Sequence, residues 1–180
     1  MKNFKVKSVE DGKTYWISRA MATRSEVIIH DNDGKCFIVV NKRGSGVADC
    51  VGMWNIPCGY LEFDVTTKEN ATKEFIEEIG SYIPPYKWTL VDIEDDPSMN
   101  HQNVTFVYQV HLTRESFNES LTKGFEMNCV AEIDEVDAIE VMPLDINEIC
   151  AKTWAFNHKE RLLAIVDEVS KIREFDPTQN

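Results

Sequence analysis

The chain has 180 residues, of which 43% are hydrophobic and 28% charged, a composition that supports a folded core and excludes a largely disordered protein. Its 31 acidic and 19 basic residues give a formal net charge of −12, which excludes a broad basic face for DNA or RNA. The length fits one domain over 1–180, with an N-terminal hairpin (1–19), a core (20–150) and a C-terminal helix (151–180).

Targeting signals and cysteine usage point to a cytoplasmic protein without a membrane partner. The first 15 residues are charged and contain no apolar signal segment, and no run of 18 apolar residues could span a bilayer. The five cysteines are odd in number and irregularly spaced, without a Cys-x-x-Cys pair, so we expect reduced thiols and no zinc site.

The first half of the chain predicts strands and turns. Segments 4–9 and 14–19 alternate loosely around an Asp-Gly turn, which is typical of a hairpin. Segments 26–30 and 36–41 are apolar and rich in β-branched residues, and they predict a second hairpin of buried strands. Segment 54–57 predicts a short strand that enters a turn at Cys58 and Gly59.

The next segment changes its period and predicts an amphipathic helix. Thr66 and Glu69 have the spacing of a capping box at its start, and Gly80 suits the position after its last turn. The apolar stripe consists of Ala71, Phe75 and Ile79.

The second half predicts three further strands at 87–94, 104–111 and 137–142, a short helix at 145–149 and a longer helix at 157–175. The longer helix carries an apolar stripe of Leu162, Ile165, Val169 and Ile172. Strands combined with two substantial helices indicate an α/β or α+β sandwich.

The helix at 66–80 carries a cluster of acids opposite its apolar stripe. Glu74, Glu77 and Glu78 stand at i, i+3 and i+4, so their carboxylates project from one side within a single turn. The like charges of these three carboxylates repel one another, and a divalent cation, which prefers carboxylate oxygens, would offset that repulsion. The alternative interpretation is a solvated acidic face. A strand, a glycine turn and a capped acidic helix in this order favour a metal held against a phosphate.

The segment from Gly59 to Ser81 resembles the Nudix box, G-x5-E-x7-R-E-U-x-E-E-x-G-U, where U is apolar. Gly59, Glu74, Phe75, Gly80 and the Glu77–Glu78 pair stand at the matching positions. The resemblance implies an α/β/α sandwich with a mixed sheet, and a Mg²⁺- or Mn²⁺-dependent pyrophosphohydrolase acting on a nucleoside diphosphate-X compound. It also implies metal ligands at Gly59, Glu74, Glu77 and Glu78, with Glu74, Glu77 or the downstream Glu135 assisting catalysis.

Three positions depart from the box. Val65 stands where glutamate is usual, Lys73 where arginine is usual, and Ser81 where an apolar residue is usual. Because the arginine and that glutamate are expected to pair, their joint loss leaves no buried charge without a partner. Glu69, four residues before Lys73, is expected to replace the pairing along the helix.

The substrate signals are weaker than the box. Pro97 lies 16 residues beyond it, which resembles the ADP-ribose pyrophosphatase subgroup. Arg43 and Arg24 are candidate phosphate or ribose contacts because guanidinium groups bind phosphate in a bidentate manner. The candidate aromatic residues for stacking on a base are Trp16, Tyr60 and Phe63, of which we favour Tyr60.

Two other classes of function stay open at this point. Val65 and Lys73 allow a catalytically weak nucleotide sensor that acts through a protein partner. The stripe of the C-terminal helix allows an interaction protein, although packing on its own sheet is the simpler interpretation. The resemblance to the ADP-ribose subgroup also implies a homodimer, to which the N-terminal hairpin would contribute.

Overall fold

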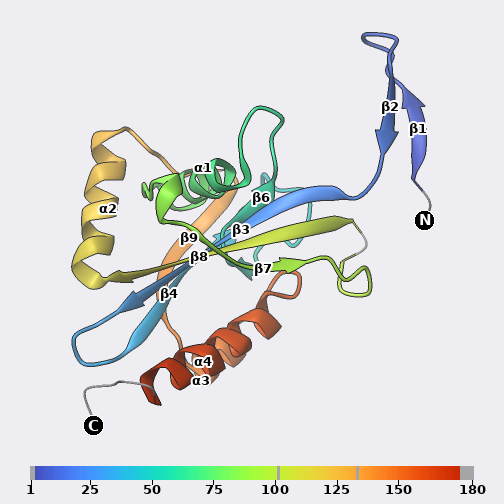
Figure 1. Cartoon of the computed structure of the whole chain (residues 1–180). Helices are drawn as coiled ribbons and strands as arrows, with labels where there is room; N and C mark the ends of the chain where they lie inside the picture. The colour runs from blue at the N-terminus through green and yellow to red at the C-terminus, as the bar shows by residue number, and fades with distance from the viewer. Residues whose placement is uncertain (1–2, 101, 133, 175–180) are drawn as a thin grey trace.

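Two long strands, β3 (Ala20–His30) and β8 (Asn103–Thr113), run parallel at the centre of the fold in the computed structural model (Figure 1). The structure describes residues 3–100, 102–132 and 134–174, with side chains up to residue 171. Within this part, seven strands form one mixed sheet in which β5-β4-β3-β8-β7 are neighbours, while β6 also pairs with β3 and β9 with β4. The mixed sheet confirms the predicted fold class.

The remaining strands of this sheet are β4 (Cys36–Arg43), β5 (Trp54–Asn55), β6 (Cys58–Tyr60), β7 (Thr89–Glu94) and β9 (Val136–Pro143). The helices are α1 (Thr67–Ile79), α2 (Arg114–Glu126), α3 (Ile146–Ala151) and α4 (His158–Glu174), with a short 3-10 turn η1 (Pro85–Lys87). None of the described helices is long and apolar enough to cross a membrane.

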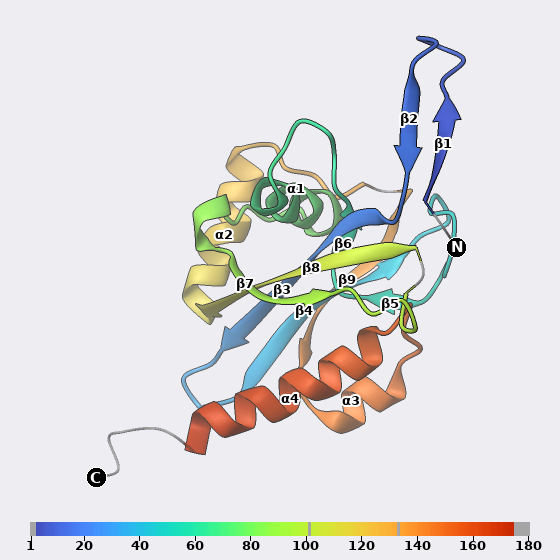
Figure 2. The ribbon, with the colours of Figure 1, turned by 45° about the vertical axis from the view of Figure 1, so that its right-hand side comes forward.

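Helices cover both faces of the sheet. Figure 2 shows α1 and α2 on one side and α3 and α4 on the other, which makes three layers. Because neighbouring side chains of a strand point to opposite faces, Val27 and Ile29 join the core under α1 while Ile28 joins the core under α4. Leu162, Ile165 and Val169 of α4 are buried in that second core, so these three positions pack on the sheet, whereas the side chain of Ile172 and all of Phe175 lie outside the described residues.

The elements differ from the prediction in three places. Strand β3 is more than twice as long as predicted, because it also pairs with β6 and with the whole of β8. The strand predicted at 54–57 is two short strands, β5 on β4 and β6 on β3. Helix α2 was not predicted at all, and it packs across the C-terminal end of α1.

The N-terminal hairpin is confirmed as β1 (Phe4–Lys7) and β2 (Thr14–Ile17), which form a separate two-stranded sheet. It projects from the body of the fold (Figure 1), and every residue in both strands is exposed. The homodimer to which this hairpin would contribute stays a prediction.

Candidate functional site

A cleft of about 830 Å³ opens beside β6 and α1. Its size lies in the range of pockets that hold small molecules, typically about 300–1,000 Å³. Its lining includes most of the residues that the sequence singled out for binding or catalysis, namely Arg24, Arg43, Gly59, Tyr60, Glu74, Glu77, Glu78 and Glu135. Strand pairing and helix packing therefore bring these sequence-distant residues to one place.

Gly59 is the point where β6 and α1 touch. A Cβ atom at this position would collide with the carboxylate of Glu74, so glycine leaves the space that this side chain occupies against the strand. The buried Asn70 fixes the approach, because its amide donates to Thr23 Oγ1 over 2.8 Å and its carbonyl accepts from the backbone N–H of Glu62 over 3.2 Å. The glycine turn and the acidic helix thus form one unit.

Glu74 and Glu78 are two carboxylates in a poorly solvated position. Burial, together with the negative charge of Glu74, raises the pKa of Glu78 to about 8. Burial likewise raises the pKa of Glu74 to about 7, which Lys73 opposes. Glu78 is only 7% exposed and accepts a hydrogen bond from Asn55 Nδ2 at 3.3 Å. The half-buried Glu74 and the buried Glu78 therefore favour a proton or a cation between them.

Lys73 braces the loop before α1 in a way that differs from the prediction. Its ammonium lies 3.3 Å from Glu62 and 2.6 Å from Glu77, so it joins the loop to the helix. Glu69, which was expected to pair with Lys73, instead closes the capping box with the backbone N–H and the hydroxyl of Thr66. The predicted Glu69–Lys73 pair is therefore wrong, and Glu62 takes the place of the missing glutamate at position 65.

The donor set suits a hard divalent cation. Gly59 offers a carbonyl oxygen, and Glu74 and Glu78 offer carboxylates whose pKa values are raised by burial and by neighbouring negative charges. Within the described residues, no three His, Cys, Asp or Glu side chains stand ready-made as a ligand group. Each glutamate instead has its own neighbour in the protein, Asn70 for Glu74, Lys73 for Glu77 and Asn55 for Glu78. The residues therefore fit a cation that draws the carboxylates together.

Glu135 reaches the cleft from the segment before β9. The backbone N–H of Gly44 donates to the Glu135 carbonyl at 2.7 Å, and the N–H of Glu132 donates to the Glu77 carbonyl at 2.7 Å. These bonds join the segment both to the end of β4 and to α1. Glu135 and Glu132 line the cleft, and their side chains are exposed.

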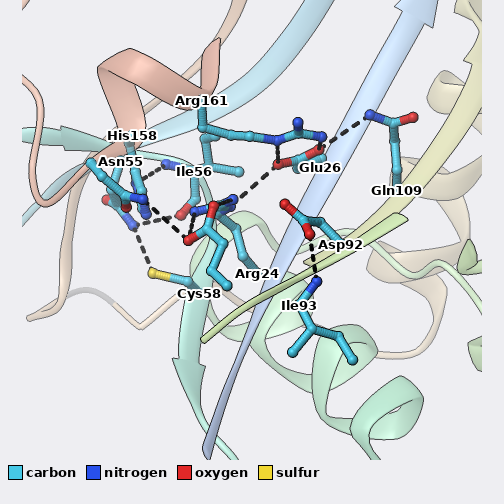
Figure 3. Close-up of polar contacts among 12 residues, drawn as sticks. Arg24, Glu26, Asn55, Ile56, Cys58, Asp92, Ile93, Gln109, His158 and Arg161 are labelled. Carbon is cyan, nitrogen blue, oxygen red and sulfur yellow. Dashed lines mark hydrogen bonds and ion pairs between the residues drawn. The ribbon is translucent and has the colours of Figure 1, made fainter. Parts of the chain in front are cut away.

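Arg24 belongs to a buried polar network under the cleft. Its guanidinium, 1% exposed, pairs with Glu26 and Glu94, while Arg161 from α4 donates to both carboxylate oxygens of Glu26 at 2.7 and 2.8 Å (Figure 3). Gln109 also donates to Glu26, at 3.2 Å. Arg24 lies in the cleft wall with its charge already compensated, so a structural role accompanies any contact with substrate.

The cleft holds fewer aromatic residues than predicted. Tyr60 lines it and is 57% exposed, whereas the predicted stacking residues Trp16 and Phe63 lie outside its lining. Trp16 belongs to the projecting hairpin, and Phe63 points from the loop into solvent.

The lining residues that sequence reasoning missed include Asn41 on β4 and the consecutive Phe156, Asn157 and His158 at the start of α4. Asn41 Oδ1 and Asn55 Oδ1 are buried without a hydrogen-bond partner. His158 is 3% exposed, and its Nδ1 accepts from the N–H of Ile56 at 3.0 Å (Figure 3). An asparagine just before a helical pattern is a signal for a helix start, but no local pattern places that start in a cleft.

The thiol of Cys58 and the imidazole of His158, both in the cleft, lack the properties of a nucleophile or a general acid. Burial raises the pKa of the Cys58 thiol to about 12, so it stays protonated. Burial also lowers the pKa of His158 well below its ordinary value, and the charges of Arg24 and Arg43 lower it further. The cleft is therefore a carboxylate site.

A three-layer fold with a glutamate helix packed on a glycine turn (Figure 2) is the arrangement that the resemblance to the Nudix box implies. Residues 23–164, more than half of the chain, match the family described as the NUDIX domain. The protein belongs to the Nudix family, which generally hydrolyses pyrophosphate bonds in nucleoside diphosphate-X compounds.

Solved structures with the same fold have low sequence identity to this chain. The NUDIX domain of Shewanella oneidensis NrtR complexed with ADP ribose is 15% identical, with a TM-score of 0.62 over 87% of this chain and 89% of that one. A MutT/nudix family protein from Enterococcus faecalis is 14% identical, with a TM-score of 0.65 over 89% of this chain and 64% of that one.

A bifunctional NMN adenylyltransferase/ADP ribose pyrophosphatase from Francisella tularensis, complexed with AMP and a Mn ion, is 16% identical with a TM-score of 0.63. That alignment covers 84% of this chain but only 42% of the other. No curated protein matches the chain significantly. At these identities the structures show the fold alone.

Proposed function

We propose that the protein is a divalent-metal-dependent pyrophosphohydrolase that cleaves a nucleoside diphosphate-X compound such as ADP-ribose or a nucleotide sugar. The observation that carries this proposal is a pair of poorly solvated carboxylates in a cleft of nucleotide size, the half-buried Glu74 against Gly59 and the buried Glu78 one turn further along α1. Two neighbouring carboxylates withdrawn from solvent are costly for a protein that uses them only as surface charge.

The cleft residues divide into metal ligands and proton acceptors. The Gly59 carbonyl, Glu74 and Glu78 would hold Mg²⁺ or Mn²⁺, with Glu77 as a further ligand. A bound divalent ion would neutralise phosphate charge and acidify a bound water. Hydrolysis joins the water oxygen to one phosphorus and breaks the bridging P–O bond, which leaves two phosphate products.

The proton of the attacking water needs a carboxylate that is free to accept it. Glu77 is held by Lys73 at 2.6 Å, whereas Glu135 lies exposed in the same cleft. We therefore favour Glu135 as the general base, with Glu77 as the other candidate. Among the cationic groups, we assign the contact with phosphate or ribose to Arg43, whose one partner Asp49 is exposed, because Arg24 is paired on both sides within the wall.

The test is product release from ADP-ribose, nucleotide sugars, dinucleoside polyphosphates and nucleoside triphosphates, with Mg²⁺, with Mn²⁺ and with a chelator. Wild-type protein should cleave one class, and the chelator should abolish cleavage. Glu74→Gln and Glu78→Gln should each lower kcat by two orders of magnitude or more, by analogy with other removals of a group that acts in the transition state. Glu119→Gln, the same change on the exposed face of α2, should have no effect.

A nucleotide sensor is the second candidate, and Lys73 is the observation that favours it. Its ammonium lies within the carboxylate cluster and bonds two of the acids, which partly supplies the positive charge that a metal would bring. A sensor would be thermally stabilised by ADP-ribose or AMP and would release no product from any compound in the panel. Chelator-sensitive turnover excludes it.

A further inference from the structure

The segment between α3 and α4 follows the edge of the sheet before it reaches the cleft. The N–H of Trp54 donates to the Thr153 carbonyl, and the N–H of Ala155 donates to the Trp54 carbonyl, both at 2.9 Å. Trp154 thereby forms a parallel bridge with Trp54 of β5, and Ala155 is fully buried. The position of the next residue, Phe156, is therefore fixed by the sheet.

Phe156 has an unusual backbone conformation. Its φ is +54°, in the left-handed region that a bulky side chain rarely adopts and that costs about 1 kcal/mol or more. Its side chain gains little burial in return, because it is 48% exposed. Backbone strain around an exposed ring is typical of a functional position.

The neighbours of Phe156 hold its ring at the cleft. His158 meets it edge-on, with ring centroids 5.4 Å apart and an interplanar angle of 64°. The guanidinium carbon of Arg43 lies 5.3 Å from the centroid of the ring, and Arg43 itself is held by Asp49 at 2.9 Å. Both neighbours line the same cleft as the glutamates. The ring is thus an apolar surface in a cleft whose other walls are largely charged or amide groups.

A half-exposed aromatic ring in a polar cleft suits a flat, π-rich part of a ligand. Bases stack on aromatic side chains and on guanidinium planes, and such stacking tolerates any base. We propose that Phe156, steadied by Arg43 and His158, is the platform on which the nucleobase of the substrate stacks. This inference rests on the proposed function and deepens it, because it assigns the nucleoside end of the substrate to the segment before α4.

If the ring of Phe156 had a purely structural role, its removal should lower the Tm rather than the affinity for a ligand. Phe156→Gly deletes the ring but also relieves the backbone, since glycine adopts a φ of +54° without strain. If the ring serves to bind a ligand, this variant should keep or raise the Tm while it loses affinity. Phe156→Trp should keep the affinity, and its indole fluorescence should be quenched by a stacked base.

The experiment measures binding by calorimetry in a chelator, where no turnover takes place. The probes are AMP, GMP, CMP and UMP, with ribose 5-phosphate as the ligand that lacks a base. Wild-type protein should bind at least one nucleotide about tenfold more tightly than ribose 5-phosphate, as expected for one stacked base. In Phe156→Gly the ratio of the two affinities, nucleotide over ribose 5-phosphate, should fall towards one.

Phe125→Ala is the matched control, because it removes another exposed ring, 82% exposed on α2 and outside the cleft lining. It should leave the ratio unchanged. The proposal is overturned if wild-type protein does not distinguish nucleotides from ribose 5-phosphate, or if Phe156→Gly keeps the ratio. Loss of the ratio in Tyr60→Ala but not in Phe156→Gly would overturn it as well, because the platform would then be Tyr60.

The result is separable from the proposed function. Base-dependent binding that requires Phe156, in a protein that hydrolyses nothing in the panel, would reject the hydrolase and support the platform. Hydrolysis at the same rate with and without the ring, on substrates that carry a base, would support the hydrolase and reject the platform.

Discussion

Glu78 has the largest electrostatic penalty among the residues of the acidic helix. Its carboxylate is 7% exposed, and burial raises its pKa to about 8. A divalent cation that binds the folded chain should remove this penalty and stabilise the protein by mass action. We expect millimolar Mg²⁺ to raise the Tm of wild-type protein relative to a chelator, in a scan by differential calorimetry.

The same substitution that abolishes turnover should also abolish this stabilisation. Glu78→Gln retains an oxygen for Asn55 Nδ2 but has no charge to neutralise, so its Tm in chelator should equal or exceed that of wild-type protein. Mg²⁺ should then add little. A Mg²⁺-induced rise of equal size in Glu78→Gln would show that the cation binds elsewhere, and Glu119→Gln should keep the full rise.

His158 should make stability depend on pH. Its folded pKa lies well below 6.5, because burial disfavours the charged ring and Arg24 and Arg43 repel it. The unfolded chain binds a proton near pH 6.5, so the contribution of neutral His158 is complete above that pH and is lost as the pH falls below it towards the folded pKa.

His158→Asn tests this dependence, because asparagine retains an acceptor for the N–H of Ile56 and does not titrate. The free energy of unfolding, measured in urea from pH 4 to 7, should decline more steeply with falling pH in wild-type protein than in the variant. Other titrating groups cancel in the difference between the two curves. If the two curves of unfolding free energy against pH are parallel, protonation of His158 does not destabilise the folded protein.

At the scale of elements, Lys73 joins the loop that begins at β6 to helix α1. Its partners Glu62 and Glu77 are exposed by 54% and 29%, so the ion pairs themselves should contribute less than about 1 kcal/mol. The bonds nevertheless orient the loop that starts at Gly59. Lys73→Gln should therefore change the Tm only slightly and lower kcat about tenfold or more, because misplacing a metal ligand is costly for the reaction.

Lys68→Gln is the comparison for this change, since Lys68 is an exposed residue of the same helix outside the cleft lining. It should leave both quantities unchanged. Equal activity of Lys73→Gln and wild-type protein would show that the brace is dispensable, and the loop would then be oriented by Asn70 alone.

Helix α1 was predictable because its signals are local. The structure confirms the capping box of Thr66 and Glu69 and the left-handed Gly80 that ends the helix, with a φ of +73°. The unexpected Ser81 has a tertiary reason. It is fully buried against α2, where its hydroxyl meets that of Ser120 at 2.8 Å.

Helix α2 was missed although its first turn has a local signal, since the Thr113 side chain accepts from the N–H of Ser116. It contains Gly124, a residue that normally weakens a helix. Here a Cβ at Gly124 would collide with the Gly80 carbonyl and crowd Ser81, so glycine allows the two helices to meet. A sequence pattern reports propensity but not such a crossing.

The candidate site shows the same division between local and tertiary signals. The three glutamates on one face of α1 follow from their spacing, and so does the glycine before them. Phe156 does not, since its left-handed backbone and its place in the cleft depend on pairing between the segment before α4 and β5. The acidic end of the cleft was therefore predictable, whereas the aromatic end required the fold.

At the scale of the whole molecule, a buried network connects the layer of α4 to the central strands. Glu26 of β3 has no exposed surface and bonds Arg24, Arg161 and Gln109, which lie on β3, α4 and β8 (Figure 3). Arg24 continues the network to Glu94, to which Asn157 also donates at 3.2 Å. The network therefore joins the cleft wall to helix α4, which follows Phe156 in the chain.

Arg161 is the residue whose loss should disturb this connection most. Arg161→Met removes two hydrogen bonds to a fully buried carboxylate and leaves Arg24 and Gln109 as its remaining partners. Breaking one side of a buried pair typically costs about 3–5 kcal/mol, so denaturant unfolding should show a loss near the lower end of that range. The double variant Glu26→Gln/Arg161→Met should recover part of it, because no buried negative charge is then left underpaired. If the losses of the two single variants simply add, Glu26 and Arg161 are not coupled, and α4 is held on the sheet by its apolar stripe alone.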